Sequence, residues 1–452
     1  MPVASAVAAK ALNGPIAPTL VRLGWPTIVV LVVQTFVGIA ETYFVSYLGT
    51  DALAGVALVF PVLMLMQMMA NGGIGGGVSS AVARARGAGR QDDAQALVWH
   101  ALLIAVGFGA LFTAGAWLGG PALYRALGGG DGAHHAALTY SNIVFAGAIP
   151  AWITALAASA LRGAGEVRVP AAVTFTTSLV LLAVSPALIF GFGPIPRLGV
   201  AGAGIAVVLY YLVTSTALLI YLRSSRSPLR LACARLEARL FRAILGVGGL
   251  SAIGTIQANL TVTLVTGAVG LYGTEAIAGY GVAARLDYLL IPLLFGFGTA
   301  VVTVVGTAVG AGDAARARRA AWIGVAIGGG TVGAIGAAAA LYPTGWVGLF
   351  SHNPQVLATG AQYLRTVAPF YVLYGAGYMM YFASQGAGRV LVPVLGGTVR
   401  LVLAGLVGWF LADRFGLPLD RLFWIVAAAT ILFGATCLAV ILDPRWGVRE
   451  KP

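Results

Sequence analysis

The chain has 452 residues, of which 59% are hydrophobic and only 9% are charged, with a mean hydropathy of +0.92. Because a soluble globular domain carries about 25% charged residues, this composition excludes an ordinary soluble domain. The formal net charge of +13 would suit a protein that binds nucleic acid, but the placement of the basic residues argues for another cause. The two cysteines, Cys233 and Cys437, are too few for a disulfide framework.

Apolar runs long enough to cross a bilayer recur along almost the whole chain. One transmembrane helix needs about 20 apolar residues, and clusters of glycine, proline and polar residues separate the runs. We therefore predict an all-α integral membrane protein with twelve transmembrane helices, at residues 25–48, 53–83, 94–119, 136–161, 169–192, 199–222, 243–271, 276–309, 315–341, 356–384, 390–412 and 418–441.

The second and eighth of these spans are too long to be straight transmembrane rods alone. Each contains a glycine-rich stretch, "NGGIGGG" at 71–77 and "FGFGTA" at 295–300. We expect these stretches to bend the helix or to let neighbouring helices approach closely.

The basic residues fix an orientation. With the N-terminus inside, 20 of the 27 Lys and Arg residues fall in cytoplasmic segments and 4 in outer loops; the other 3 lie within the spans, as Arg285, Arg365 and Arg400. The positive-inside rule then places both termini in the cytoplasm. The net charge follows from this topology, so no nucleic-acid partner is expected.

The sequence contains an internal repeat. "ALRGAGEVRVP" at 160–170 matches "ASQGAGRVLVP" at 383–393 in seven of eleven positions, and "GTDALAG" at 49–55 matches "GTEAIAG" at 273–279 in five of seven. The offsets are 223 and 224 residues. Landmarks in the same order at a nearly constant offset indicate two halves of six helices each. Since six is even, the halves are parallel and pseudo-symmetric, related by an axis along the membrane normal.

This repeat predicts the organisation of the chain. We expect a cytoplasmic N-terminal segment, an N-lobe of helices 1–6, an Arg-rich cytoplasmic linker, a C-lobe of helices 7–12 and a cytoplasmic tail, at residues 1–24, 25–222, 223–242, 243–442 and 443–452. Transporters use the interface between such lobes as a substrate site and rock one lobe against the other. No GxxxxGK[ST] loop is present, so transport would be driven by an ion gradient or run downhill.

Five motifs in order resemble the multidrug and toxic compound extrusion family of the MOP superfamily. They are "ETYFVSYLGTDALAG" at 41–55, "GAGR" at 87–90, "ALRGAGEVRVP" at 160–170, "IFGFGPIPRLGVAGAGIA" at 189–206 and "FGFGTAVVTVVGTAVGAG" at 295–312. The resemblance covers about residues 20 to 442. It implies twelve helices in two lobes around a central cleft, and export of organic cations or drugs by antiport against protons or sodium.

Glu41 is the predicted ion-coupling residue. In the family the helix 1 motif usually reads Asp-Thr, and that acid carries the coupling cation; here the motif reads Glu41-Thr42. Gln34, Gly38 and Glu41 share one helix face, which suits a cleft wall better than lipid. A charged acid facing lipid at this depth costs about 2–3 kcal/mol or more. The alternative is a structural acid, satisfied by a neighbouring Arg or hydroxyl.

The rest of the family's cation site is not kept. Relatives carry an Asn and an Asp four residues apart on helix 5, where this chain has Leu181 and Ser185 before Pro186. The repeat counterpart of Glu41 is Val265. Sodium prefers several oxygen ligands, so this pattern favours protons as the coupling ion. A transporter with weakened or lost coupling is a further alternative.

Other polar and aromatic residues could line the cleft, and each has a plainer explanation. Interhelical hydrogen bonding is the alternative for the amides, and lipid or lobe packing is the alternative for the tyrosines at 3–4 spacing. For Arg285 and Asp287 it is ion pairing with groups on other helices or anchoring at the outer interface. Arg400 needs a buried partner that the sequence does not name. The substrate-cleft candidates are Gln34, Thr42, Gln67, Asn71, Gln257, Asn259, Asp287, Tyr288, Tyr374 and Tyr378.

Other functions are also conceivable. A flippase for lipid-linked oligosaccharides or lipids is the main alternative, but such relatives often have extra helices and cationic cavities. A membrane enzyme would need clustered His, Asp or Glu at a membrane face, and a channel a symmetric pore ring. We therefore predict no enzymatic activity, no cofactor and no metal site. The expected protein is a monomeric multi-pass protein of the cell's inner membrane whose partners are a drug-like organic cation, a proton (or sodium) and the lipid bilayer.

Overall fold

The computed structural model describes residues 14–128, 130–194 and 196–448, and its regular elements in these ranges are helices. Residues 1–13 and 449–452, the outer parts of the predicted N-terminal segment and tail, lie outside the described residues. The first half contains α2 (Ile16–Ser46), α3 (Thr50–Met68), η1 (Met69–Ile74), α4 (Gly75–Gly87), α5 (Gln91–Ala126), α6 (Asp131–Ala146), α7 (Ala148–Gly163), α8 (Arg168–Phe190) and α9 (Val200–Arg223).

The second half follows the same course. It contains α10 (Ala238–Gly270), α11 (Thr274–Gly310), α12 (Ala314–Leu341), α13 (Pro343–Val347), α14 (Pro354–Val367), η2 (Ala368–Phe370), α15 (Tyr371–Ala387), α16 (Leu391–Arg400), η3 (Leu401–Val407), α17 (Gly408–Phe415), α18 (Leu419–Ala439) and η4 (Val440–Leu442).

Ten helices of the described chain are long and apolar enough to cross a membrane, and the pair α6–α7, bent by 49° at Gly147, brings the number to eleven. The predicted span 356–384 is the exception, because α14, η2 and α15 divide it. Pro369 lies in η2, and its missing N–H removes a helix hydrogen bond there. The structure is therefore a polytopic helical membrane protein, and the count of twelve spans stays a prediction.

The two glycine-rich stretches act as expected. "NGGIGGG" coincides with the π-helix η1, which interrupts the second span, and a Cβ on Gly77 would overlap the α10 backbone at Ile244 and Gly248. "FGFGTA" lies in the unbroken α11, where Gly296 packs against Ile28 of α2. One stretch therefore distorts its helix, and both allow close approach.

Buried apolar side chains form two large clusters. One is built from elements between Val45 and Ile244, and the other mainly from elements between Val265 and Trp446, together with Val167 and the start of α2. Helix α2 contributes to more than one cluster: Ile16, Leu20 and Leu23 belong to the second large cluster, whereas its later residue Val37 packs on α8 and α9. Helix α2 therefore connects the two halves. The predicted lobe boundaries stay predictions.

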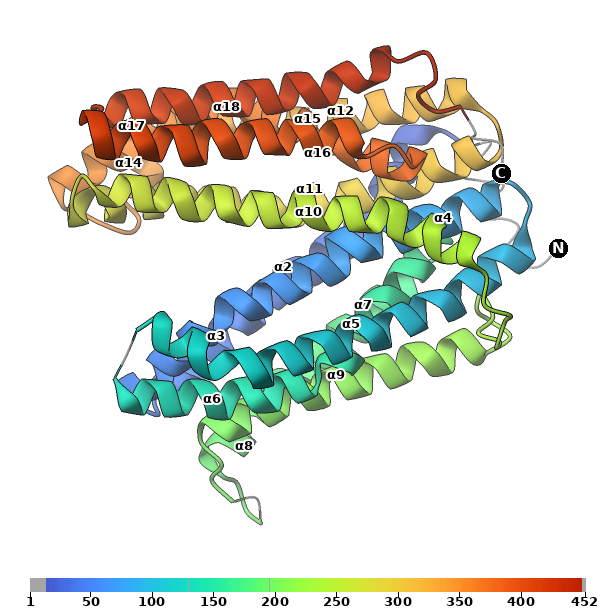
Figure 1. Cartoon of the computed structure of the whole chain (residues 1–452), viewed down its shortest axis with the longest axis horizontal. Coiled ribbons are helices and arrows are strands. Elements are labelled where there is room, and N and C mark those ends of the chain that lie inside the picture. The colour runs from blue at the N-terminus through green and yellow to red at the C-terminus, as the bar shows by residue number, and fades with distance from the viewer. Residues whose placement is uncertain (1–13, 129, 195, 449–452) are drawn as a thin grey trace.

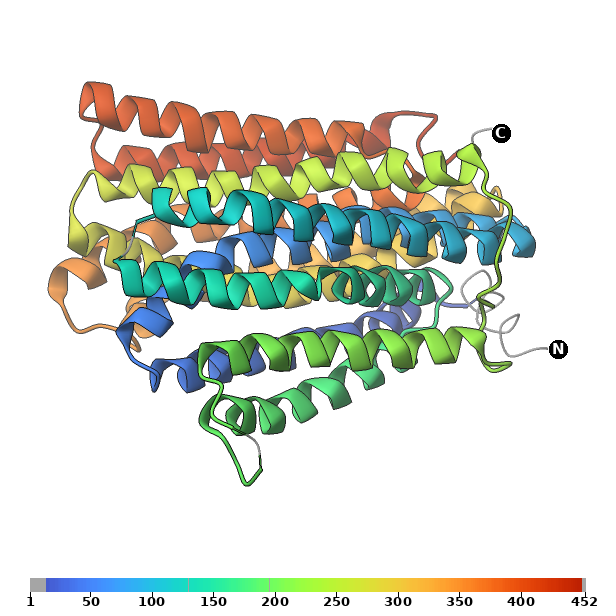
Figure 2. The same cartoon turned by 60° about the horizontal axis from the view of Figure 1, so that its bottom comes forward.

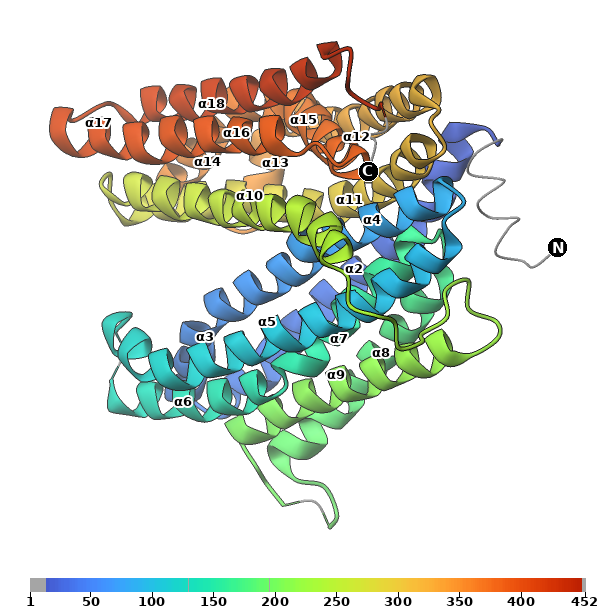
Figure 3. The ribbon, with the colours of Figure 1, turned by 45° about the vertical axis from the view of Figure 1, so that its right-hand side comes forward.

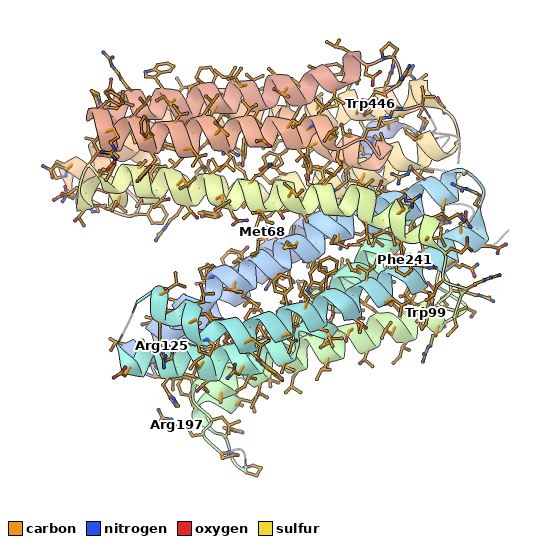
Figure 4. The ribbon with its side chains drawn as sticks, in the orientation of Figure 1. Met68, Trp99, Arg125, Arg197, Phe241 and Trp446 are labelled. Atoms are coloured by element: carbon orange, nitrogen blue, oxygen red, sulfur yellow. The ribbon has the colours of Figure 1, made fainter. Side chains whose placement is uncertain are left out.

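The two halves meet at one end of the molecule and separate toward the other. Figure 1 shows the helices after residue 238 (yellow-green to red) above those before residue 223 (blue to green), close together at the end where both termini lie. At this end α4 packs against α10, α11 and α15. Figure 4 places Trp99, Phe241 and Trp446 at the same end, and Arg125 and Arg197 at the opposite one.

The segment 224–237 connects the halves at the end with the termini, as Figures 2 and 3 show. His100 of α5 is fully buried; its Nδ1 lies 2.8 Å from the Ala96 carbonyl, and its Nε2 accepts a hydrogen bond of 3.0 Å from the Glu237 N–H. Arg239 donates two hydrogen bonds to Asp93, of 2.7 and 2.9 Å. The start of α10 is thereby attached to α5.

Gln385 of α15 holds the junction between the halves. Its side chain is fully buried, and its amide nitrogen donates to the Gly72 carbonyl at 3.0 Å and to the Ser251 hydroxyl at 2.9 Å. The Ser80 hydroxyl of α4 donates to the Gln385 carbonyl at 2.5 Å. This one residue therefore joins η1, α4 and α10 to α15.

We expect Gln385→Ala to lower the stability of the purified protein, because it removes both amide hydrogen bonds and leaves the buried Ser251 hydroxyl without its donor. A buried group left unpaired costs about 1–3 kcal/mol. The measurement is the melting temperature in detergent, followed by tryptophan fluorescence. Gln91→Ala, at an exposed position at the start of α5, is the control, and equal melting temperatures for the two variants would contradict the role given to Gln385.

Candidate functional site

Glu41 lies in the second half of α2, half-buried against α8. The Ser185 hydroxyl donates a hydrogen bond of 2.8 Å to its Oε2. Its Oε1 is buried and has no hydrogen-bond partner among the described residues. An unpaired acceptor in a membrane span is unfavourable. This oxygen is therefore a position that a proton or another small cation can occupy.

The other residues predicted on this helix divide into two groups. Gln34, on the same face as Glu41, donates from its side-chain amide to the Tyr210 hydroxyl of α9 at 3.0 Å. Thr42 is exposed, and its hydroxyl donates to the Gly38 carbonyl of its own helix at 2.9 Å. The Gln34 and Glu41 side chains thus reach across to α8 and α9, whereas the Thr42 hydroxyl stays on α2.

The α8 residues Leu181 and Ser185 differ in what they offer near Glu41. Leu181 is 8% exposed and packs with Val37, Ala206 and Tyr210. Ser185 is fully buried and its hydroxyl faces the carboxylate. Within the described chain, no group of three or more His, Cys, Asp or Glu residues could hold a metal ion.

Asp287 of α11 is held by two tyrosines from the predicted tenth span. The Tyr371 hydroxyl of α15 donates to Oδ1, and the Tyr363 hydroxyl of α14 donates to Oδ2 at 3.2 Å. Arg285 does not face it: its guanidinium lies 5.2 Å from the centroid of the Phe350 ring. The partners of Asp287 are thus two tyrosine hydroxyls and that of Arg285 is an aromatic ring, so within the described chain neither forms the ion pair that was one expectation; Tyr288 is 57% exposed.

The tyrosines of α15 and Arg400 form an aromatic and cationic group in the second half. The Tyr374 and Tyr378 rings are 4.8 Å apart, and Tyr378 lies 5.2 Å from the Phe433 ring of α18. The Arg400 guanidinium stands over Tyr374, 4.9 Å from its centroid. The missing partner of Arg400 is therefore an aromatic face, which attracts cations. The sequence did not name this partner, because Tyr374 lies 26 residues away on another helix.

The amide candidates make hydrogen bonds between or within helices. Gln257 is 9% exposed and donates to the Thr398 hydroxyl of α16 at 2.7 Å. The Asn259 amide donates to the Thr255 carbonyl at 2.9 Å and lies 3.1 Å from the Met68 sulfur, where α3 approaches α10 (Figure 4).

The remaining amide pair stays on one helix. The Asn71 amide donates to the Gln67 carbonyl at 3.0 Å, at the start of η1. In the structure, these amides are engaged in hydrogen bonds to other protein groups. The polar candidates as a whole do not lie around one common point. Glu41 belongs to a group on α2, α8 and α9, and Asp287 with Arg400 to a group on α11, α14, α15, α16 and α18.

The sequence model of the MatE family matches residues 26–187 and again residues 251–410. These two stretches make up more than half of the chain. The chain belongs to the MatE family. The second match begins 225 residues after the first (251 against 26), close to the offset of the sequence motifs.

Relatives of this MatE chain are membrane transporters. The probable multidrug resistance protein NorM of Thermotoga maritima is 27% identical over 441 residues, 95% of this chain and 93% of its own. The FAD transporter of Shewanella oneidensis is 26% identical over 312 residues, 68% of this chain and 69% of its own. A solved structure described as the outward-facing conformation of a multidrug resistance MATE family transporter is 26% identical, with a TM-score of 0.83 over 97% of this chain and 96% of that chain.

Proposed function

We propose that this MatE transporter exports drug-like organic molecules by antiport against protons, with Glu41 as the proton carrier. The observation that carries the proposal is the half-paired carboxylate within a membrane span: one oxygen accepts from Ser185, and the other is buried without a partner in the described chain. Protonation removes the charge of a carboxylate that has only one hydrogen bond in an apolar span, which lowers the cost of its burial. This lower cost supports reversible protonation at this position.

The proton is preferred to sodium as the coupling ion because Glu41 has few oxygen ligands around it. Ser185 supplies one hydroxyl, whereas the neighbouring Leu181 supplies none and packs with apolar groups. Sodium would need several oxygens, including charged ones, by the logic that governs hard cations.

The orientation of the proposed transporter follows from its charges. The end where the halves meet carries the Arg-rich segments, so the positive-inside rule places it and both termini in the cytoplasm. The twelve predicted spans in the inner membrane would agree with this arrangement. Helices close together at the cytoplasmic end and apart at the other correspond to an outward-facing transporter, and the solved relative described as outward-facing supports this interpretation.

Alternating access then requires the cytoplasmic junction to open. The contacts of Gln385, Ser80 and their partners would break while the outer ends of the two halves approach each other. A proton taken up from outside on Glu41 would be released inside after this change, and the substrate would move in the opposite direction. The ion gradient supplies the energy. Binding of the proton or the substrate at either side shifts the population between the outward-facing and inward-facing states.

The substrate class is wider than organic cations alone. The FAD transporter relative is named for a large, aromatic, negatively charged molecule, whereas the NorM relative is named for multidrug resistance. We therefore describe the substrate of this chain as a drug-like aromatic molecule. The flippase alternative is less well supported, because among the residues predicted within spans only three are basic.

Ethidium transport in proteoliposomes tests the role of Glu41. We expect an imposed pH gradient to drive ethidium transport by the wild type and an imposed sodium gradient to drive none. Glu41→Gln should reduce the pH-driven transport to the level of empty liposomes, because the amide cannot carry a proton. Glu275→Gln, at an exposed acid at the start of α11, is the matched control and should transport like the wild type. Transport driven by sodium alone, or retained by Glu41→Gln, would show that another group couples the ion.

Cys233 offers a test of the orientation. It is a free, exposed cysteine in the segment 224–237, whereas Cys437 is buried. A membrane-impermeant maleimide should label inside-out vesicles and not right-side-out vesicles, and Cys233→Ser should abolish the labelling. Labelling of right-side-out vesicles at this cysteine would place the Arg-rich segment outside and contradict the topology.

A further inference from the structure

Arg400 has a guanidinium that the described protein leaves unbound. It ends α16 inside the candidate span Leu391–Phe415 and is half-buried. The side chain stands over the rings of Tyr374 and Phe433, at 4.9 and 6.0 Å from their centroids. It therefore points into the second half of the molecule and not to lipid. Among the described residues it makes no hydrogen bond and no ion pair, and its Nε is buried without a partner.

Asp287 makes no direct contact with it in the described chain. The two groups lie within electrostatic range of each other, but the described chain forms no ion pair between them, and both Asp287 oxygens already accept hydrogen bonds from tyrosines. A guanidinium has five N–H donors in a planar fork. A charged group in a membrane span is costly, and the charged groups found there usually serve a function. Aromatic faces reduce that cost but accept no conventional hydrogen bond.

The backbone around Arg400 is also unusual. The π-helix η3 begins directly after it, at Leu401, and continues to Val407. Short π-helical segments inside α-helices occur frequently at functional sites. Thr398, two residues earlier, is tied to Gln257 of α10. Arg400 thus lies between a residue bonded to α10 and a π-helical segment, and its own donors have no hydrogen-bond partner in the described chain.

We propose that Arg400 binds the carboxylate of an aromatic substrate whose ring system stacks against Tyr374 and Tyr378. A carboxylate matches the planar fork of a guanidinium with two parallel hydrogen bonds, and the tyrosine rings next to it favour a flat aromatic molecule. Neither tyrosine is fully buried, and the Arg400 guanidinium already stands over the Tyr374 ring. The inference rests on the proposed export function and defines its substrate class: amphipathic aromatic acids and zwitterions, in addition to cations.

The test compares two ligands that differ in one group. Norfloxacin carries a carboxylate, and its ethyl ester has the same ring and amine without that charge. Binding of each to the purified protein in detergent is measured by the fluorescence anisotropy of the quinolone. We expect the wild type to bind the acid about tenfold more tightly than the ester, the difference that one charge-assisted interaction makes in affinity. Extra hydrophobicity would favour the ester, so it cannot produce this result.

The variants assign the preference to Arg400. In Arg400→Gln the preference should fall to about twofold or less, since a neutral amide replaces the fork. Arg400→Lys keeps the charge without the fork and should show an intermediate preference; it also serves if the Gln variant does not fold, as judged by size-exclusion chromatography. Arg197→Gln, which removes the same charge from the loop after α8 (Figure 4), should keep the full preference.

Three results would overturn the inference: equal affinities of the wild type for both ligands, a preference that survives in Arg400→Gln, or no binding of either ligand to the wild type. Ethidium has no carboxylate, and its pH-driven transport by the wild type is measured on the same preparation. Loss of ethidium transport together with an intact carboxylate preference would refute the export function and leave the Arg400 site. Ethidium transport without the preference would refute only the site.

Discussion

The cost of an unpaired charge in lipid determines where the chemistry of this protein can lie. Every backbone group in a span must be satisfied by the protein itself, and an ionised side chain there is tolerated only with a partner or for a function. Three ionisable groups in the spans are stabilised in different ways. Glu41 accepts one hydrogen bond, Asp287 accepts two, and Arg400 rests on aromatic rings without a hydrogen bond from the described chain. The first and the third are only partly satisfied, and these two carry the proposals.

The two halves differ in polarity although they repeat in sequence. The first half has a carboxylate on α2, with Val265 at the repeat-related position of α10 buried in an apolar cluster. The second half has the guanidinium of Arg400 and a wall of tyrosines. Helix α2 packs on α11 at its beginning and on α8 near Glu41. Helix α2 therefore contacts both halves. Protonation of Glu41 on this helix can thus change how the two halves are placed relative to each other.

Much of the fold could be predicted from the sequence, because helices that cross lipid need long apolar runs and these are easy to recognise. Helix α2 begins at Ile16, before the predicted start at residue 25, since backbone hydrogen bonds continue through a helix that leaves the apolar layer. Breaks were harder to locate. The bend at Gly147 and the π-helix η3 leave hydropathy unchanged, because they alter only the hydrogen-bond register. The interruption at η2 has a signal in Pro369, which a hydropathy window averages away.

The site was predicted in its residues and not in its contacts. Glu41 stood out as an acid in an apolar run, but its partner Ser185 lies 144 residues away. The tyrosines on Asp287 lie 76 and 84 residues from it, beyond any local pattern. Arg400 was recognised as needing a buried partner, but no local pattern in the sequence points to the Tyr374 ring on another helix. The face shared by Gln34 and Glu41 was legible because helix geometry alone fixes it.

Antiport with Glu41 as the proton carrier requires that substrate binding and protonation of Glu41 oppose each other, and proton release on substrate binding tests this most directly. Ethidium is added to the purified protein in detergent in a weakly buffered solution, and the pH is followed with an indicator dye. The account predicts that the wild type releases protons in proportion to the ethidium bound, and that Glu41→Gln binds ethidium without releasing any. Proton release of equal size in Glu41→Gln, or no release by the wild type at any starting pH, would contradict it.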